Sequence, residues 1–232
     1  MNGQVLTAVR LHLVTPVRSV LAPWAVLALS VGANLLLFAT ITLGHPEVVA
    51  TGGVFALHTA LFAWGVSAAV RTLPYAVSLG VTRRGYLLGT GLLAVAQAVA
   101  GGAGLAVLRA VERGTGHWGI GLRLADLGFL ASGGPVTAAV AYSGPLLLAC
   151  AGGFAVGTAQ RRWGTPGLLL LATLLPAAVA AFAWWTVRLH GARDLLDWVA
   201  GRPALELQAL WPTVLALVLA ALAWTGVRRA EA

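Results

Sequence analysis

Long apolar runs alternate with short polar segments along almost the whole chain. Six runs carry no charge at their centres, at residues 20–43, 53–71, 87–108, 136–159, 165–187 and 209–227. A helix needs about 20 predominantly apolar residues to cross the hydrocarbon core of a bilayer. The pattern therefore predicts an all-α integral membrane protein whose transmembrane domain, residues 20–227, contains six transmembrane helices.

Residues 1–19 have a different pattern, which is typical of a helix lying along a membrane surface. Apolar residues stand at positions 5, 6, 9 and 13, and polar residues at 4, 7, 10 and 12. We expect an amphipathic elbow helix here, after which Pro16 and Pro23 bend the chain into the first span. The alternative is an ordinary flexible N-terminus.

The composition supports the membrane assignment, and the positions of the charges suggest an orientation. Hydrophobic residues make up 59% of the chain and charged residues 9%, against about 25% charged residues in soluble domains. Six spans place both termini on one side of the membrane. That side carries nine of the fifteen arginines, namely Arg10, Arg18, Arg71, Arg83, Arg84, Arg161, Arg162, Arg228 and Arg229, and one of the seven acidic residues.

Cytoplasmic loops carry the excess of basic residues, so we expect both termini, including the tail at 228–232, to lie in the cytoplasm of a bacterial inner membrane. The arginines flank the spans, where membrane topology and anionic lipid headgroups account for them. Nucleic acid is therefore not an expected partner.

The connections between spans sort onto the two sides. We expect outer loops at 109–135, with a short amphipathic helix around Leu122–Leu130, and at 188–208, with an interfacial helix over Asp194–Ala200. On the inner side, residues 160–164 predict a tight hairpin, whereas the connection at 72–86 is longer. The pairs Gly85/Gly89 and Gly153/Gly157 have the spacing that lets helices approach closely.

Signatures of catalysis and of metal binding are missing from the sequence. There is no Walker A pattern, the five histidines are scattered, and no carboxylates are clustered, so we expect no metal site. Cys150 is single and is expected to be a small buried residue. The polar residues of the spans are mainly Asn34, His58, Gln97 and Tyr142, which we expect to hydrogen-bond between helices or to line a substrate path.

The inner connection at 72–86 combines a short helix, a helix stop and a helix cap. Pro74 suits the first turn of a helix, Gly80 suits its C-terminal end, and Thr82 can cap the following span. Arg83 and Arg84 would then lie at the membrane edge, able to pair with acidic groups of a partner or with lipid phosphate. A loop that only sets the topology is the alternative.

The stretch Leu79-Gly80-Val81-Thr82-Arg83-Arg84, followed by Gly85-Tyr86-Leu87-Leu88-Gly89, resembles the inner loop of the membrane subunits of bacterial type-2 ABC exporters. The elbow helix, six spans and internal termini match the layout of that family along the whole chain. Residues 190–208 depart from it, because they are too polar for a deep re-entrant helix.

The resemblance implies a permease subunit of an ATP-driven exporter that is not itself an enzyme. It would form a substrate path by pairing with a second permease copy or a paralogue. ATP and magnesium would bind to a separate ATPase subunit, so no cofactor is expected in this chain. The ATPase would be coupled through Pro74, Tyr75, Leu79, Gly80, Thr82, Arg83 and Arg84.

Two other functions remain open from the sequence. One is a six-span membrane scaffold or immunity-type protein without transport. The other is an intramembrane enzyme with a Ser–His pair that uses His58.

Overall fold

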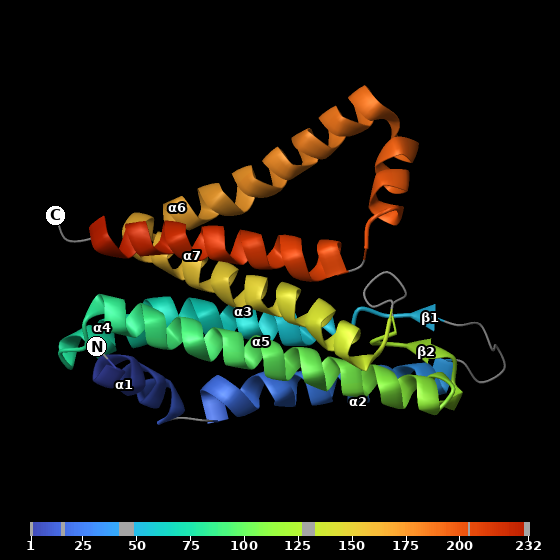
Figure 1. Ribbon diagram of the computed structural model, residues 1–232, viewed down its shortest axis with the longest axis horizontal. Helices are drawn as coiled ribbons and strands as arrows, with labels where there is room; N and C mark the ends of the chain where they lie inside the picture. Colours follow the sequence, from blue (N-terminus) through green and yellow to red (C-terminus); the bar gives the residue numbers. More distant parts are fainter. Residues whose placement is uncertain (1, 15–16, 42–48, 127–132, 204, 230–232) are drawn as a thin grey trace.

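The computed structural model describes residues 2–14, 17–41, 49–126, 133–203 and 205–229 as a helical bundle (Figure 1). The elements in chain order are α1 (Asn2–Leu13), the π-helical turn η1 (Val17–Leu21), α2 (Ala22–Ile41), β1 (Val49–Ala50), α3 (Phe55–Ser67), the π-helical turn η2 (Ala68–Thr72), α4 (Leu73–Ser78), α5 (Arg83–Gly114), the 3-10 turn η3 (His117–Gly119), β2 (Leu122–Arg123), α6 (Pro135–Ala200), the π-helical turn η4 (Glu206–Leu210) and α7 (Trp211–Arg229). Pro16 lies outside the described residues, and Pro23 is the second residue of α2.

Five helical stretches within the described residues are long and apolar enough to cross a membrane. They are Ser19–Thr40, Phe55–Ser78, Arg83–Gly114, Pro135–Leu170 and Glu206–Val227. They agree with five of the six runs in the sequence and support a helical, multi-pass membrane protein. The remaining run, 165–187, is helical as part of α6, and its crossing of the membrane stays a prediction.

Helix α6 consists of three helical pieces, because the backbone leaves the helical conformation at Gly164 (φ 63°) and at Gly191 (φ 78°). The chain reverses direction at Gly164, which agrees with the tight hairpin predicted at residues 160–164. The helical piece that follows diverges from α7 (Figure 1). The piece after Gly191 includes Asp194–Ala200, so the helix expected there is present.

The N-terminus, α4 and the end of α7 share one end of the bundle, and β1 and β2 lie at the other end (Figure 1). We call the first the terminal end and the second the strand end. This arrangement agrees with the sorting of the loops between two sides. The sequence does not reveal the short parallel pair, in which Val49 is opposite Leu122 and Ala50 is opposite Arg123.

The prediction of an amphipathic helix around Leu122–Leu130 is wrong for the residues that the structure describes. Residues Leu122–Arg123 form strand β2, residues 124–126 are not helical, and 127–130 lie outside the described residues. Two contacts explain the extended backbone. Thr51 donates its N–H to the carbonyl of Arg123 (2.9 Å). The buried carboxylate of Glu112, on α5, accepts hydrogen bonds from the N–H groups of Leu124 and Ala125.

Small residues set the closest helix contacts. A Cβ atom at Gly153 would collide with the backbone of Phe62 on α3, and one at Gly157 would lie 2.7 Å from the Cβ of Ala69. The pair Gly85/Gly89 similarly admits α1, because a Cβ at Gly89 would lie 2.7 Å from Ala8. Both glycine pairs therefore permit the close approach that their spacing indicates.

Candidate functional site

The segment at 72–86 has the stop that its sequence predicts, but its helix is not separate, because α4 continues the helical stretch Phe55–Ser78 through η2. Pro74 lies in the first turn of α4, and Gly80 follows the helix with φ at 81°. Gly80 donates its N–H to Val77 O (2.9 Å), and Val81 donates to Ala76 O (3.0 Å). These two bonds form a Schellman motif, in which a glycine with positive φ ends the helix.

Thr82 caps α5, also as predicted. Its backbone is extended, and its hydroxyl accepts a hydrogen bond from the N–H of Gly85 (3.2 Å). The side chain of Gln4, on α1, accepts from the N–H of Thr82 (2.9 Å) and from its hydroxyl. The turn between α4 and α5 is therefore attached to the N-terminal helix.

The α4 helix has one buried side and one exposed side. Leu73 and Ala76 pack into the bundle, whereas Tyr75 is 59% exposed and Leu79 is 56% exposed. An aromatic and a large aliphatic side chain are thus exposed at the terminal end, Tyr75 on α4 and Leu79 in the turn that follows it. Tyrosine is a typical anchor of protein–protein contacts, and Leu79 adds exposed apolar surface.

The two arginines after Thr82 have different surroundings. Arg84 is exposed. Arg83 is half-buried and donates from Nη1 to the carbonyl of Val227 on α7 (2.9 Å). Together with Arg161 and Arg162, Arg83 lines a cavity of about 380 Å³ beside α4. The segment expected to contact a partner therefore adjoins a basic cavity.

The other polar residues singled out from the sequence do not converge on one path. Asn34 donates from Nδ2 to Ser30 O (2.8 Å) within α2, and His58 Nδ1 lies 3.3 Å from Val54 O, one turn back in the chain. The amide nitrogen of Gln97 is buried and has no hydrogen-bond partner among the described residues. Tyr142 belongs to a separate cluster at the strand end.

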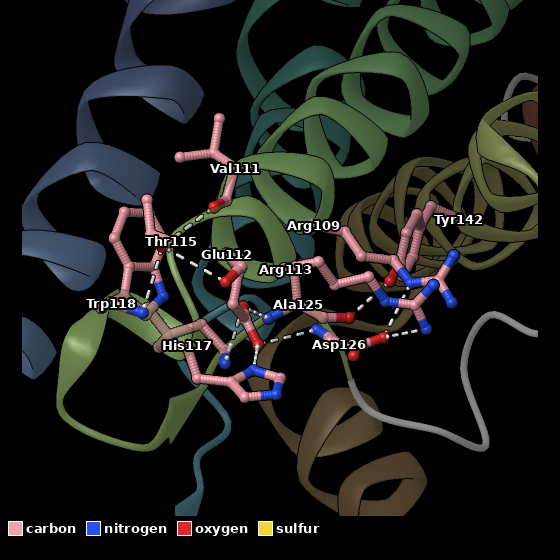
Figure 2. A network of polar contacts seen from close by, with 11 residues as sticks. Arg109, Val111, Glu112, Arg113, Thr115, His117, Trp118, Ala125, Asp126 and Tyr142 are labelled. Carbon is pink, nitrogen blue, oxygen red and sulfur yellow. Dashed lines mark hydrogen bonds and ion pairs between the residues drawn. The ribbon is translucent and has the colours of Figure 1, made fainter.

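That charged cluster is built around Glu112, a fully buried carboxylate in the last turns of α5 (Figure 2). Its Oε2 accepts from the N–H groups of Leu124 (3.1 Å) and Ala125 (2.8 Å), and its Oε1 accepts from that of Asp126 (3.3 Å). A carboxylate near a helix C-terminus is disfavoured by the helix dipole. Three backbone donors compensate this cost and bind residues 124–126 to α5.

Two arginines of α5 complete the cluster through Asp126. Arg109 donates from Nε to Asp126 Oδ1 (2.9 Å), and Arg113 Nη2 lies 2.8 Å from the same oxygen. Burial by itself would raise the pKa of Asp126, but the hydrogen bonds from Arg113 and Arg109 outweigh it and lower the pKa below its ordinary value. Tyr142, on α6, donates to Ala125 O and so ties a third element to the cluster.

The loop between α5 and β2 curls back beneath the cluster. His117 and Trp118 have positive φ angles of 57° and 63°, and Thr115 Oγ1 accepts from the N–H of Trp118 (3.1 Å). This places His117 Nδ1 at 3.6 Å from Glu112 Oε1 (Figure 2). Removal of one member of a buried ion pair is costly, because it leaves the other charge buried without its partner.

The sequence contains a signal for this cluster in the spacing of charges along α5, although the two carboxylates, Glu112 and Asp126, lie far apart in the chain. Arg109, Glu112 and Arg113 stand at relative positions 0, 3 and 4, which share one helix face. Along the chain they have the pattern of charges that flank a span. The partner Asp126 is thirteen residues beyond Arg113, across a loop whose path the sequence does not show.

Comparisons of the chain with protein-family models, with curated proteins and with solved structures found no match.

Proposed function

We propose that the protein is the permease subunit of an ATP-driven exporter. It would pair with a second permease copy or a paralogue and be moved by a separate ATPase that docks on α4. Supporting this proposal is the resemblance of residues 79–89 to type-2 ABC exporters, together with several apolar helices and a terminal end that is rich in arginine. The ATPase would supply ATP and magnesium.

The shape of α4 is the observation that carries the proposal. A stop at Gly80 ends α4 and Thr82 caps α5 directly after it, and yet Tyr75 and Leu79 remain more than half exposed. A loop that only connects two spans needs neither a fixed turn nor exposed anchors. A helix that transmits force from a partner needs both.

The docking test uses the chain co-expressed with a candidate ATPase subunit, which is sought first in the neighbouring reading frames. Tyr75→Ala combined with Leu79→Ala removes exposed surface without emptying the core. Loss of two anchor residues should weaken ATPase binding about 30-fold or more, since an interface hot spot contributes about 2 kcal/mol. Affinity of the purified subunits is the primary readout, and ATP hydrolysis in vesicles is the second.

Leu210→Ala combined with Trp211→Ala is the matched control at the strand end, because Leu210 is 55% and Trp211 52% exposed. It should leave ATPase affinity unchanged. Equal binding by the α4 double variant and the wild-type chain would refute docking on α4. Absence of any binding or stimulation by the wild-type chain would refute the exporter proposal itself.

A labelling experiment tests the orientation and the number of spans. The single cysteine, Cys150, is buried, so new cysteines report with little background. With a membrane-impermeant maleimide on intact cells, Gly114→Cys and Arg193→Cys should react, and Ser78→Cys should react only in inverted vesicles. Labelling of Ser78→Cys on intact cells would contradict the orientation, and protection of Arg193→Cys there would contradict a crossing by 165–187.

A further inference from the structure

Two cavities lie one after the other along the helices α5, α6 and α7. The first, the polar cavity, is the 380 Å³ space at the terminal end, lined by Arg83, Arg161, Arg162, Thr158, Ser78 and Val227 among others. The second, the apolar groove, has about 480 Å³ and is lined almost entirely by apolar side chains, including Leu88, Gly91, Phe154, Leu217, Ala220 and Trp224.

The helices α5, α6 and α7 line both spaces at successive turns, and α4 adds a further wall to the polar cavity through Leu73, Pro74, Val77 and Ser78. On α5, Arg83 lines the polar cavity and Leu87 the apolar groove. On α6, Thr158 lines the first and Phe154 the second, and on α7 the corresponding residues are Val227 and Trp224. Residues three or four positions apart share a helix face, so the groove continues from the cavity toward the middle of the spans.

Packing of the helices leaves this crevice between α5 and α7. Both helices pack extensively against α6, which forms its floor. At the polar cavity, Arg83 joins the two walls through its hydrogen bond to Val227 O. Further along, Gly91 presents no side chain, and a Cβ atom there would meet no other atom within 4 Å.

The chemistry of the crevice changes along its length from cationic to apolar. None of the described residues that line the polar cavity is acidic, so no described lining residue neutralises the guanidinium groups of Arg161 and Arg162. Guanidinium groups bind phosphate oxygens through paired hydrogen bonds. An apolar groove that opens between transmembrane helices suits a hydrocarbon chain, and the cavity lies at the ends of the spans, where lipid headgroups are found.

We propose that this crevice binds one anionic phospholipid, with its phosphate among Arg83, Arg161 and Arg162 and one acyl chain along the apolar groove. Basic pockets between transmembrane helices are known to hold anionic headgroups. The charge of the cavity selects an anionic headgroup over a zwitterionic one, and the groove adds affinity that a free phosphate lacks. The proposal does not depend on an ATPase or on transport.

The test is a titration of the purified, delipidated full chain in neutral detergent, followed by native mass spectrometry. Phosphatidylglycerol should bind with a stoichiometry of one, and phosphatidylcholine with the same acyl chains should bind much more weakly. Arg161→Gln combined with Arg162→Gln should weaken phosphatidylglycerol binding about 25-fold, since each arginine near a headgroup contributes about a fivefold gain. Gly91→Phe, which fills the groove, should abolish retention of the lipid.

Matched controls separate a site from general attraction. Arg10→Gln combined with Arg71→Gln removes two exposed arginines outside the crevice, and Gly32→Phe places the same aromatic ring on α2, where a Cβ also meets nothing within 4 Å. Both should bind phosphatidylglycerol like the wild-type chain. Thermal unfolding of each variant checks that the fold is intact.

Three results would overturn the proposal. Equal loss of binding in the arginine control would indicate nonspecific charge attraction. Equal binding of phosphatidylcholine and phosphatidylglycerol would remove the role of the polar cavity. Binding of glycerol 1-phosphate as tightly as phosphatidylglycerol, with Gly91→Phe unchanged, would show a site for the phosphate alone.

Discussion

Glu112 is the residue whose replacement most directly tests how the strand end is held together. The substitution Glu112→Gln preserves the size of a side chain that is fully buried, while it removes the charge and turns one acceptor oxygen into a donor. The amide oxygen can still accept from the N–H groups of Leu124 and Ala125. The NH₂ group then faces the N–H of Asp126, which donates to Glu112 Oε1 in the wild-type chain.

The expected cost follows from these bonds. A buried donor left without an acceptor costs about 1–3 kcal/mol, and hydrogen bonds to a charged group are worth about 1 kcal/mol more than neutral ones. Relief of the desolvation of a buried charge offsets part of this sum. We expect Glu112→Gln to destabilise the attachment of residues 124–126 to α5 by about 3 kcal/mol, which is about a hundredfold in the opening equilibrium.

Hydrogen exchange measures this opening directly. Amides of residues 124–126 should exchange about a hundredfold faster in Glu112→Gln, whereas amides in the middle of α5 should keep their wild-type rates. Glu206→Gln is the control, because its ion pair with Arg202 (3.3 Å) is partly exposed and such pairs contribute at most about 1 kcal/mol. Unchanged exchange at 124–126 in Glu112→Gln, or an equal effect of Glu206→Gln, would refute the clamp.

Three further predictions concern packing and pH. Gly153→Ala should destabilise the bundle in thermal unfolding, because its Cβ collides with the α3 backbone. The control Gly152→Ala should be neutral or slightly stabilising, because its Cβ comes no closer than 3.7 Å to another side chain. Equal effects of the two substitutions would contradict the close approach of the helices at Gly153. Burial lowers the pKa of His12 from 6.5 to about 4, so folding favours the neutral imidazole. The free energy of unfolding should therefore keep its full value above pH 6.5 and decrease on acidification toward pH 4, by about 2 kcal/mol between pH 7.5 and 5. A His12→Asn variant that keeps this pH dependence of unfolding would contradict the prediction. Asp126 has a lowered pKa, so its contribution to the free energy of unfolding is present above the ordinary carboxyl pKa and disappears as the pH falls through the lowered value. Asp126→Asn should remove this loss of stability at acidic pH. An unchanged dependence of unfolding on acidic pH in the variant would contradict the prediction.

Several local features of the fold followed from the sequence because they depend on neighbouring residues. The apolar runs predicted five helices that are long and apolar enough to cross a membrane, and Gly80 and Thr82 predicted the end of one helix and the cap of the next. Each signal acts through the backbone over one or two turns. The same locality explains the error at Leu122–Leu130, where periodicity suggested a helix but distant partners fix an extended backbone.

The sequence by itself determined that this is a helical, multi-pass membrane protein, how its loops divide between two ends, and where α4 ends. Hydrophobic length, helix capping and turn chemistry are local properties, so they can be read along the chain. Only the tertiary structure decided that Asp126 meets Arg109 and Glu112 across a loop, and that Arg83, Arg161 and Arg162 share one cavity. Those contacts depend on how distant helices pack against one another, which no single segment encodes.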